Sequence, residues 1–295
     1  MSIEIDFSKS VAEEINFFGR RFFIKRDDLL DDNFCGNKAR KFLYFLEHNF
    51  PNIDTVVSSG SSQSNAMHSL SVLAKMKNWK FIYYVDHLNS YLQHNPCGNF
   101  AHAMQNNMIL EIGEMPMTFD SNVLVINEGG AQIEARFGIQ KLADEIKTWA
   151  NEQKIEKLKI FLPSGTGTTA LYLQEFLDFE VVTVPCVGDC EYLKKQFLSL
   201  QSDEKLHPVI LKPSKKYHFA NLYTELFETY QSLLRETGIE FELLYDPVGW
   251  TVLGENLGHF EGFEVLYIHQ GGLKGNATMK PRYERKLQNK TKVES

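Results

Sequence analysis

A segment rich in glycine and threonine, Ser164-Gly165-Thr166-Gly167-Thr168, stands between a predicted strand and a predicted helix. Two glycines let a ligand approach the backbone closely, and free amides at the start of a helix bind anions, above all phosphate. The segment is not a Walker loop, because no lysine follows the last glycine, and it is not a G-x-G-x-x-G motif. A glycine-rich turn followed by a threonine helix cap explains the same residues equally well.

Uncharged hydrogen-bonding side chains crowd residues 58–65, just before a predicted helix over 66–77. They are five serines, including Ser64, one glycine, Gln63 and Asn65. Such hydroxyls and amides can surround a carboxylate with directed donors. An extended helix-capping region is the structural alternative.

Three cations, Lys38, Arg40 and Lys41, lie at the start of a predicted helix, where the helix dipole disfavours positive charge. A lysine held near an anion site with its amine deprotonated can form a Schiff base with an aldehyde. The alternative for Lys38 is an ordinary surface lysine, and we interpret Arg40 and Lys41 as mostly structural.

The elements that position these residues alternate between strand and helix. Strand patterns cover 55–57, 81–85, 108–110, 123–126, 159–162, 181–184, 209–211 and 265–268, and amphipathic helix patterns lie between them. This alternation predicts parallel sheets covered by helices on both faces. Polar or glycine-rich segments follow strands at 58–65, 128–130, 163–168 and 270–272, which is where open α/β sheets bind ligands.

The composition narrows the class of function. The 295 residues are 43% hydrophobic and 23% charged, with a net charge of −7, which disfavours nucleic acid and anionic membranes as partners. We expect no signal peptide and no membrane span. Cys35, Cys97, Cys186 and Cys190 form no C-x-x-C pair, and the nine histidines are scattered, so we expect reduced cytoplasmic thiols and no metal.

Two further segments invite an interpretation. His269 precedes a Gln-Gly-Gly sequence and is expected to be a wall of the cleft rather than a substrate contact. Residues 280–295 hold six basic and two acidic residues. A solvated helix end or frayed terminus explains them better than a nucleic-acid-binding tail in so acidic a chain.

Together these segments resemble the pyridoxal-phosphate enzymes of the 1-aminocyclopropane-1-carboxylate deaminase and D-cysteine desulfhydrase group, which have the tryptophan-synthase β-type fold. The resemblance is carried by Lys-Arg-Asp-Asp at 25–28, Gly-Asn-Lys-Ala-Arg-Lys at 36–41, Gln-Ser-Asn at 63–65 and the loop at 164–168. Glu-Gly-Gly at 128–130, Asp-Pro-Val at 246–248 and His-Gln-Gly-Gly-Leu at 269–273 are further landmarks, and order and spacing agree over about residues 20 to 275.

The resemblance implies an α/β architecture of two domains with a cleft between them (fold type II). The large cofactor-binding domain would comprise residues 1–45 and 155–295, and the small domain, residues 46–154, would close on the substrate. Lys38 would be the Schiff-base lysine and the base that moves protons at the substrate carbon.

The other roles follow from the same resemblance. Asn65 would hydrogen-bond the phenolic oxygen of the cofactor, and Ser64 would hold the substrate carboxylate or act on the substrate directly, with Gln63 beside it. The loop from Ser164 to Thr168 would surround the phosphate.

The chain departs from the family after Asp-Pro-Val, where Tyr and then Glu or Thr are usual and this chain has Gly249, Trp250 and Thr251. If Gly249 is an insertion, Trp250 replaces the active-site tyrosine beside the substrate and Thr251 faces the pyridine nitrogen. The upstream family tyrosine falls at Phe219. Loss of both phenols disfavours opening of a cyclopropane ring. A threonine at the ring nitrogen weakens the electron sink, which favours β-elimination of a thiol.

The predicted function is a pyridoxal-phosphate-dependent deaminase or carbon–sulfur lyase that converts a small amino acid, D-cysteine rather than 1-aminocyclopropane-1-carboxylate, into a 2-oxo acid and ammonia by final hydrolysis. A racemase or β-replacement enzyme with the same lysine and loop is an alternative. A catalytically degenerate pyridoxal-phosphate-binding protein is another. We expect a cytoplasmic homodimer.

Overall fold

The larger of two sheets combines strands from the first and last parts of the chain, and its strand β7 leads into the glycine–threonine loop. The computed structural model describes residues 5–34 and 36–294, with side chains as far as residue 289. The larger sheet has the order β1-β2-β10-β7-β8-β9. Its strands are β1 (Ala12–Phe17), β2 (Arg20–Lys25), β7 (Leu158–Ser164), β8 (Glu180–Pro185), β9 (Val209–Ile210) and β10 (Glu264–Ile268).

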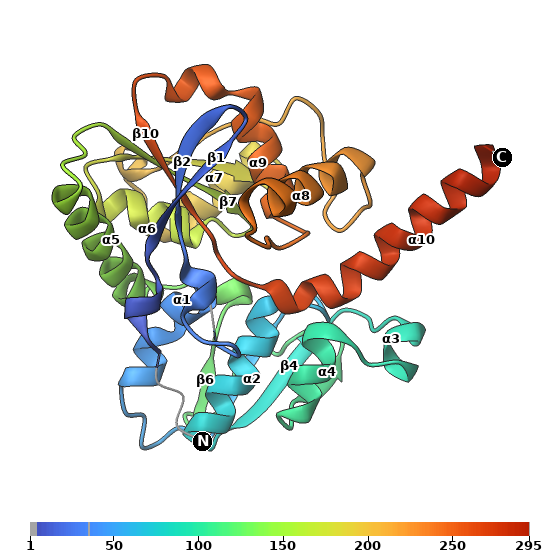
Figure 1. Cartoon of the computed structure of the whole chain (residues 1–295). Coiled ribbons are helices and arrows are strands. Elements are labelled where there is room, and N and C mark those ends of the chain that lie inside the picture. The colour runs from blue at the N-terminus through green and yellow to red at the C-terminus, as the bar shows by residue number, and fades with distance from the viewer. Residues whose placement is uncertain (1–4, 35, 295) are drawn as a thin grey trace.

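The smaller sheet has the order β5-β4-β3-β6 and is wholly parallel. Its strands are β3 (Thr55–Ser59), β4 (Lys80–Val85), β5 (Ile109–Ile112) and β6 (Val123–Val125). The helices are α1 (Gly36–Glu47), α2 (Asn65–Lys77), α3 (Ser90–His94), α4 (Gly98–Gln105), α5 (Ala135–Glu152), α6 (Thr168–Phe176), α7 (Cys190–Leu200), α8 (Thr224–Thr237), α9 (Asp246–Glu255) and α10 (Asn276–Glu294). Figure 1 shows the larger sheet with α5 to α9 above and the smaller sheet with α2 to α4 below.

Strand β7 lies at the centre of the larger sheet, between β10 and β8 and parallel to both. Every residue of β7 is buried, as expected for a parallel strand covered on both faces. One hydrophobic cluster lies on each side, with Phe161 in one and Ile160 in the other. The carboxyl end of this buried strand presents Ser164, so the loop that follows begins in the core of the sheet.

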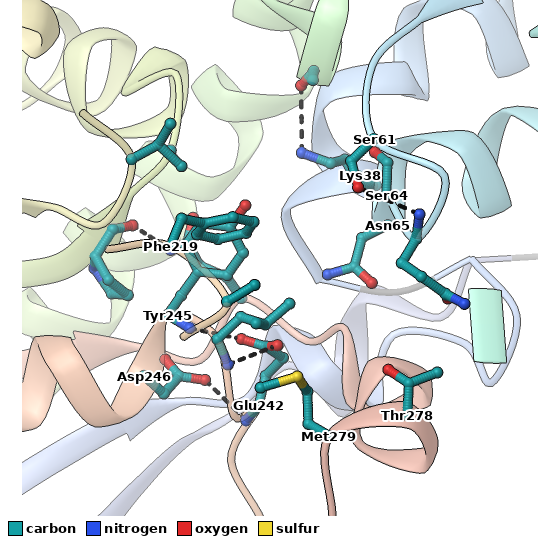
Figure 2. A pocket seen from close by; sticks show the side chains of 18 of the residues that line it. Lys38, Ser61, Ser64, Asn65, Phe219, Glu242, Tyr245, Asp246, Thr278 and Met279 are labelled. Carbon is teal, nitrogen blue, oxygen red and sulfur yellow. Dashed lines mark hydrogen bonds between the residues drawn. The ribbon is translucent and has the colours of Figure 1, made fainter. Parts of the chain in front are cut away.

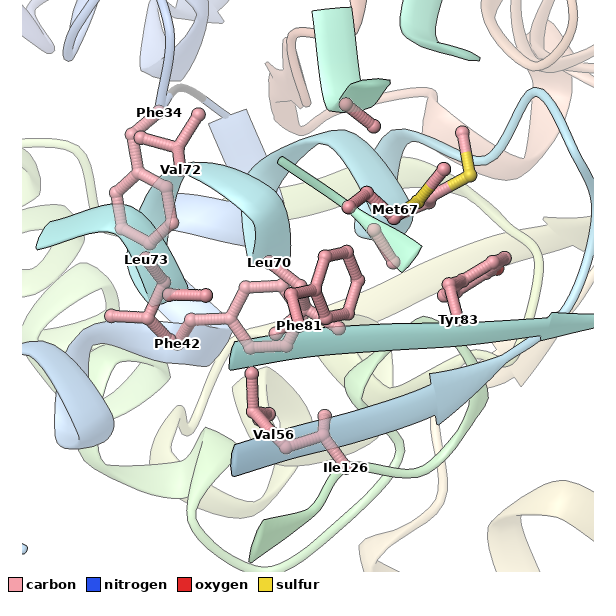
Figure 3. Close-up of a cluster of buried hydrophobic side chains, with 14 of the residues drawn as sticks. Phe34, Phe42, Val56, Met67, Leu70, Val72, Leu73, Phe81, Tyr83 and Ile126 are labelled. Atoms are coloured by element: carbon pink, nitrogen blue, oxygen red, sulfur yellow. The ribbon is translucent and has the colours of Figure 1, made fainter. Parts of the chain in front are cut away.

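The smaller sheet packs against α1, α2 and α4 through a separate cluster (Figure 3). Phe42 of α1, Leu70 and Leu73 of α2, and Val56 and Phe81 of the strands meet there, and each is at most 2% exposed. This core fixes the start of α2, and therefore the segment at 63–65, relative to α1.

The parallel α/β fold predicted from the sequence is confirmed, and each predicted strand appears in the sheets. The antiparallel hairpin of β1 and β2 was not predicted. Its turn residues, Phe18 and Gly19, both have positive φ, and phenylalanine is not a turn signal at such a position. The boundaries of the two proposed domains stay a prediction.

Some expectations concern parts of the chain that the structure does not describe. Cys35 and the first four residues lie outside the described residues, whereas Cys97, Cys186 and Cys190 carry free thiols. Among residues 5–34 and 36–294, no helix is both long and apolar enough to cross a membrane.

The basic segment at 280–295 begins inside a long helix rather than a frayed end. Met279 and Tyr283 of α10 are buried against the body of the protein. Beyond them the helix extends away from both sheets (Figure 1).

Candidate functional site

The amines of Lys38 and Lys41 lie side by side at the start of α1. Both donate to the carbonyl oxygen of Gly129, at 3.2 Å and 3.1 Å, and Lys41 lies 3.5 Å from the Thr166 hydroxyl. Burial lowers the pKa of Lys38 to about 8, against the opposing attraction of Glu128. Burial, and then repulsion by Lys38, hold the pKa of Lys41 well below its usual range. Two amines with lowered pKa values therefore share one neutral acceptor next to the glycine–threonine loop.

The backbone at Gly36 explains why α1 begins where it does. Gly36 has a φ of +63°, and a Cβ there would lie 1.7 Å from the carbonyl oxygen of Gln270. That oxygen accepts from the Asn37 N–H at 3.0 Å. The Asn37 side-chain amide also donates to the Gln270 side-chain oxygen at 2.9 Å. Only glycine permits this approach, which ties the first turn of α1 to the segment after β10 and fixes Lys38.

Arg40 is buried for a different reason. Its guanidinium pairs with Asp27 at 2.7 Å and with Glu145 of α5 at 2.6 Å, and it is fully buried. Of the three basic residues that begin α1, Arg40 therefore has a structural role in buried ion pairs, and the two lysines line the cavity. Lys41, interpreted from the sequence as structural, belongs with Lys38.

The glycine–threonine loop ends in α6, whose first turn is rich in hydroxyls. Gly167 has a φ of +73°, and a Cβ there would lie 2.4 Å from the Phe197 ring. The Thr166 and Thr168 hydroxyls are 3.0 Å apart, whereas the Ser164 hydroxyl is turned to Thr183 at 2.6 Å. The buried hydroxyl of Thr169 has no partner among the described residues. The loop thus offers helix-start amides and an unsatisfied hydroxyl.

The segment before α2 provides the opposite wall. Ser64 caps α2, accepting from the N–H groups of residues 66 and 67 at 3.1 Å and 3.4 Å. The Asn65 side-chain oxygen accepts from Asn99 at 2.6 Å, so its amide nitrogen is left as a donor. Gln63 is bound to the start of α4 through the Cys97 carbonyl at 3.1 Å. All three side chains line the same cavity as Lys38.

Residues 242–246 form a third wall that the sequence interpretation missed. The buried Glu242 carboxylate accepts from the N–H groups of Leu244 and Tyr245, both at 2.8 Å. Burial, with Asp246 nearby, raises the pKa of Glu242 to about 8. Burial also raises the pKa of the Tyr245 phenol far above its usual range, so the phenol stays protonated and can donate. Figure 2 shows Tyr245 and Glu242 across the cavity from Lys38, Ser64 and Asn65.

These three walls enclose one cavity of about 900 Å³. It is lined by Lys38, by the segment from Gln63 to Asn65, and by the whole of the loop from Ser164 to Thr168. Phe219 also lines it, with its ring 5.3 Å from that of Tyr245. The structure therefore brings together most of the site residues chosen from the sequence.

Trp250 and Thr251 do not reach this cavity, which corrects the sequence interpretation. Trp250 is fully buried in the core of the larger sheet, stacked on Tyr267 at 4.4 Å, and the Thr251 hydroxyl lies 3.2 Å from Thr229. Both belong to α9, which begins at Asp246, so one helical turn carries them behind the cavity wall. A phenol does line the cavity, that of Tyr245, the residue before Asp-Pro-Val.

His269 is a structural residue beside the site. It is fully buried, its Nε2 lies 2.8 Å from the Glu240 carbonyl oxygen, and its Nδ1 accepts from the Gly271 N–H at 3.2 Å. Over residues 5–34 and 36–294, no group of three or more His, Cys, Asp or Glu side chains is placed to hold a metal ion.

Thr169 and Tyr245 had weak signals in the sequence. Thr169 follows the predicted anion loop at the next position of the helix, and Tyr245 precedes a family landmark. Glu242 had no signal, since a glutamate that follows Glu240 and Phe241 in alternation with apolar residues is typical of an exposed charge.

No family model matches the chain. Among curated proteins, it is similar to "Putative D-cysteine desulfhydrase 2, mitochondrial" of Oryza sativa subsp. japonica, with 23% identity over 184 residues, 55% of this chain and 45% of that protein. The chain therefore matches less than half of the length of this curated relative.

Solved structures share the fold over 90% of the chain. An ACC deaminase homologue has a TM-score of 0.72 with 19% identity and is covered over 89% of its length. A hydrogen sulfide-producing enzyme of Fusobacterium nucleatum has a TM-score of 0.63 with 15% identity and 96% coverage. A pyridoxal 5'-phosphate-dependent aspartate racemase has a TM-score of 0.59 with 15% identity and 90% coverage. The chain has the fold of these enzymes.

Proposed function

We propose that the chain is a pyridoxal-phosphate-dependent enzyme of the 1-aminocyclopropane-1-carboxylate deaminase and D-cysteine desulfhydrase group, which converts a small amino acid into a 2-oxo acid and ammonia. The observation that carries this proposal is the pair of buried amines, Lys38 and Lys41, against one carbonyl oxygen next to a loop with an unsatisfied hydroxyl. The relative and the shared fold support it, and the name of one neighbour includes the cofactor.

The residues fit the cofactor. A phosphate on the loop would accept from the Thr169 hydroxyl and from the start of α6, and it would give the Lys41 amine the counter-ion that it lacks. Lys38, three residues earlier on the same helix, would hold the aldehyde carbon. Asn65 would direct its free amide donor at the phenolic oxygen. Thr251 is not available to the ring nitrogen, so the proposal includes no contact from it.

Lys38 is the residue of the chain that we propose moves the proton. With a pKa of about 8, a substantial fraction of its amine is neutral near physiological pH, and it can act as nucleophile and as base. The bound cofactor would supply an electron sink for bonds at the substrate α-carbon. Tyr245, held protonated, would donate to a leaving group or substrate oxygen, while Ser64 and Gln63 would orient the substrate carboxylate.

The preference for D-cysteine over the cyclopropane amino acid no longer follows from missing phenols, because Tyr245 lies in the cavity. Both substrates therefore belong to the proposal. A racemase of the same fold is the second candidate, since an aspartate racemase is among the structural neighbours. Release of ammonia and 2-oxo acid separates the first candidate from inversion of the substrate enantiomer alone. Saturation with the cofactor and no turnover of either kind would indicate the degenerate binding protein.

The decisive experiment tests whether pyridoxal phosphate attaches covalently to Lys38. Purified protein mixed with pyridoxal phosphate and reduced with borohydride is expected to carry the cofactor on the peptide that contains Lys38. The Lys38→Ala variant is expected to carry none and to release no ammonia from a panel of D- and L-amino acids. An unmodified Lys38 in protein saturated with pyridoxal phosphate would overturn the proposal.

We further propose that the enzyme works in the cytoplasm as a homodimer. The free thiols of three described cysteines support a reducing compartment. Light scattering coupled to size-exclusion chromatography tests the dimer, and a mass of one chain would contradict it.

A further inference from the structure

The cavity continues beyond Lys38 to one face of α10. Thr278, Arg282 and Arg285 line it, and their spacing of four and three residues places them on one side of the helix. Figure 2 shows Thr278 on the same side of the cavity as Asn65, across from Tyr245. The two arginines therefore lie in the same cavity as the amine of Lys38 but come from a different element.

Both arginines lack an acidic partner within the described residues. Arg282 donates to the Ala220 carbonyl oxygen at 2.9 Å and approaches the Met279 sulfur at 3.0 Å, so its head group is held in place by neutral atoms. Arg285 is exposed and forms no ion pair in the part of the chain that the structure describes. The acidic side chains of the cavity, Glu128, Glu242 and Asp246, pair with neither arginine.

Two like charges three residues apart on a helix repel each other. Arginine side chains with open guanidinium faces are suited to carboxylate and phosphate groups, which they bind with two parallel hydrogen bonds. The cavity of about 900 Å³ is also at the upper end of the range for small-molecule sites, which leaves room beyond a cofactor and a three-carbon amino acid.

We infer that Arg282 and Arg285 form a distal anion subsite, and that an amino acid whose far end carries a carboxylate or a phosphate is a better substrate than D-cysteine or the cyclopropane amino acid, which carry no such group. The inference rests on the proposed function for the amino-acid end, which would lie at Lys38 and Ser64. The distal charge would be recognised by α10, so this helix selects the substrate without touching the reacting atoms.

The test is titration calorimetry of the full chain saturated with pyridoxal phosphate, with glutarate and its monoamide as unreactive probes. Wild-type protein is expected to bind glutarate roughly tenfold more tightly than the monoamide, as one charge-assisted contact gives. Arg282→Gln combined with Arg285→Gln is expected to abolish this preference. Lys286→Gln is the control for loss of charge on the same helix, because it removes one positive charge next to Arg285 from a residue that does not line the cavity.

Kinetics provide a second readout. The ratio of kcat/KM for glutamate over glutamine, and for O-phosphoserine over serine, is expected to fall in the arginine variants and to persist in Lys286→Gln; the two pairs distinguish carboxylate from phosphate. Equal binding of glutarate and its monoamide by the wild type, or the same loss in Lys286→Gln, would overturn the subsite. Cofactor attachment at Lys38 is scored separately. A protein with the glutarate preference but no attached cofactor would keep the subsite and refute the proposed function.

Discussion

The amines of Lys38 and Lys41 donate to the same carbonyl oxygen, that of Gly129, at 3.2 Å and 3.1 Å. Two buried cations on one neutral acceptor are stable only if at least one is deprotonated or an anion joins them. The arrangement therefore assigns different tasks to two lysines that are three residues apart on one helix.

Lys38→Met and Lys41→Met are expected to fail in different ways. Lys38→Met should abolish covalent attachment, whereas Lys41→Met should keep it but raise the cofactor dissociation constant about tenfold or more, because a charge-assisted contact to phosphate is lost. Mass spectrometry after borohydride reduction and a titration of the visible absorbance measure the two effects. Lys75→Met, an exchange of a surface lysine, is the control; loss of attachment in Lys41→Met would contradict this division.

Thr169→Val tests the unsatisfied hydroxyl. Without cofactor, removal of a buried hydroxyl that has no partner should leave the free energy of unfolding unchanged or raise it by about 1 kcal/mol. Thr183→Val, which removes a hydroxyl bonded to Ser164 and Leu162, should lower it by about 1–3 kcal/mol. With cofactor, Thr169→Val should bind more weakly. Urea unfolding of the two variants with and without pyridoxal phosphate measures these changes. Equal losses of stability in the two variants without cofactor would contradict the role of the Thr169 hydroxyl as an unpaired donor.

Glu242 predicts a pH dependence of stability. Its pKa is raised to about 8 in the folded protein, so between about 4.5 and 8 the folded state binds the extra proton and this group makes stability fall as pH rises. Glu242→Gln should flatten that fall. Glu240, whose pKa is lowered by Lys280 and other partners despite its burial, has the opposite sign: its contribution is present above about 4.5 and is lost in acid. Melting temperatures of Glu242→Gln and Glu240→Gln from about pH 3 to pH 8 check this, and parallel curves for the two would exclude it.

Tyr245, to which the sequence interpretation gave no role, lines the cavity that Trp250 was expected to line. Trp250→Phe should lower the free energy of unfolding by about 1–3 kcal/mol and leave KM nearly unchanged, because the ring packs in the core. Tyr245→Phe should leave the fold stable and lower kcat, because only the phenol that faces the cavity is removed. Thermal melts and steady-state kinetics on the two proteins separate these effects; a changed KM in Trp250→Phe alone would restore the earlier interpretation.

Much of the molecule follows from local patterns. Short apolar runs determine the parallel strands, because the centre of a strand buried on both faces must be apolar, as residues 160–162 of β7 are. The loop from Ser164 to Thr168 was chosen from residue type, and Lys38 and Asn65 from the resemblance to a known family; all of them line one cavity.

The tertiary structure decided what spacing alone leaves open. Whether Trp250 or Tyr245 faces the cavity depends on where α9 begins, since a helix turns successive side chains by about 100°. Whether Lys41 is structural depends on Gly129, which is 88 positions away. Arg282 and Arg285 looked like part of a solvated end until the first turns of α10 packed against the body and brought them to the cavity. Such contacts join residues that are distant in the chain, and only the packed fold brings them together.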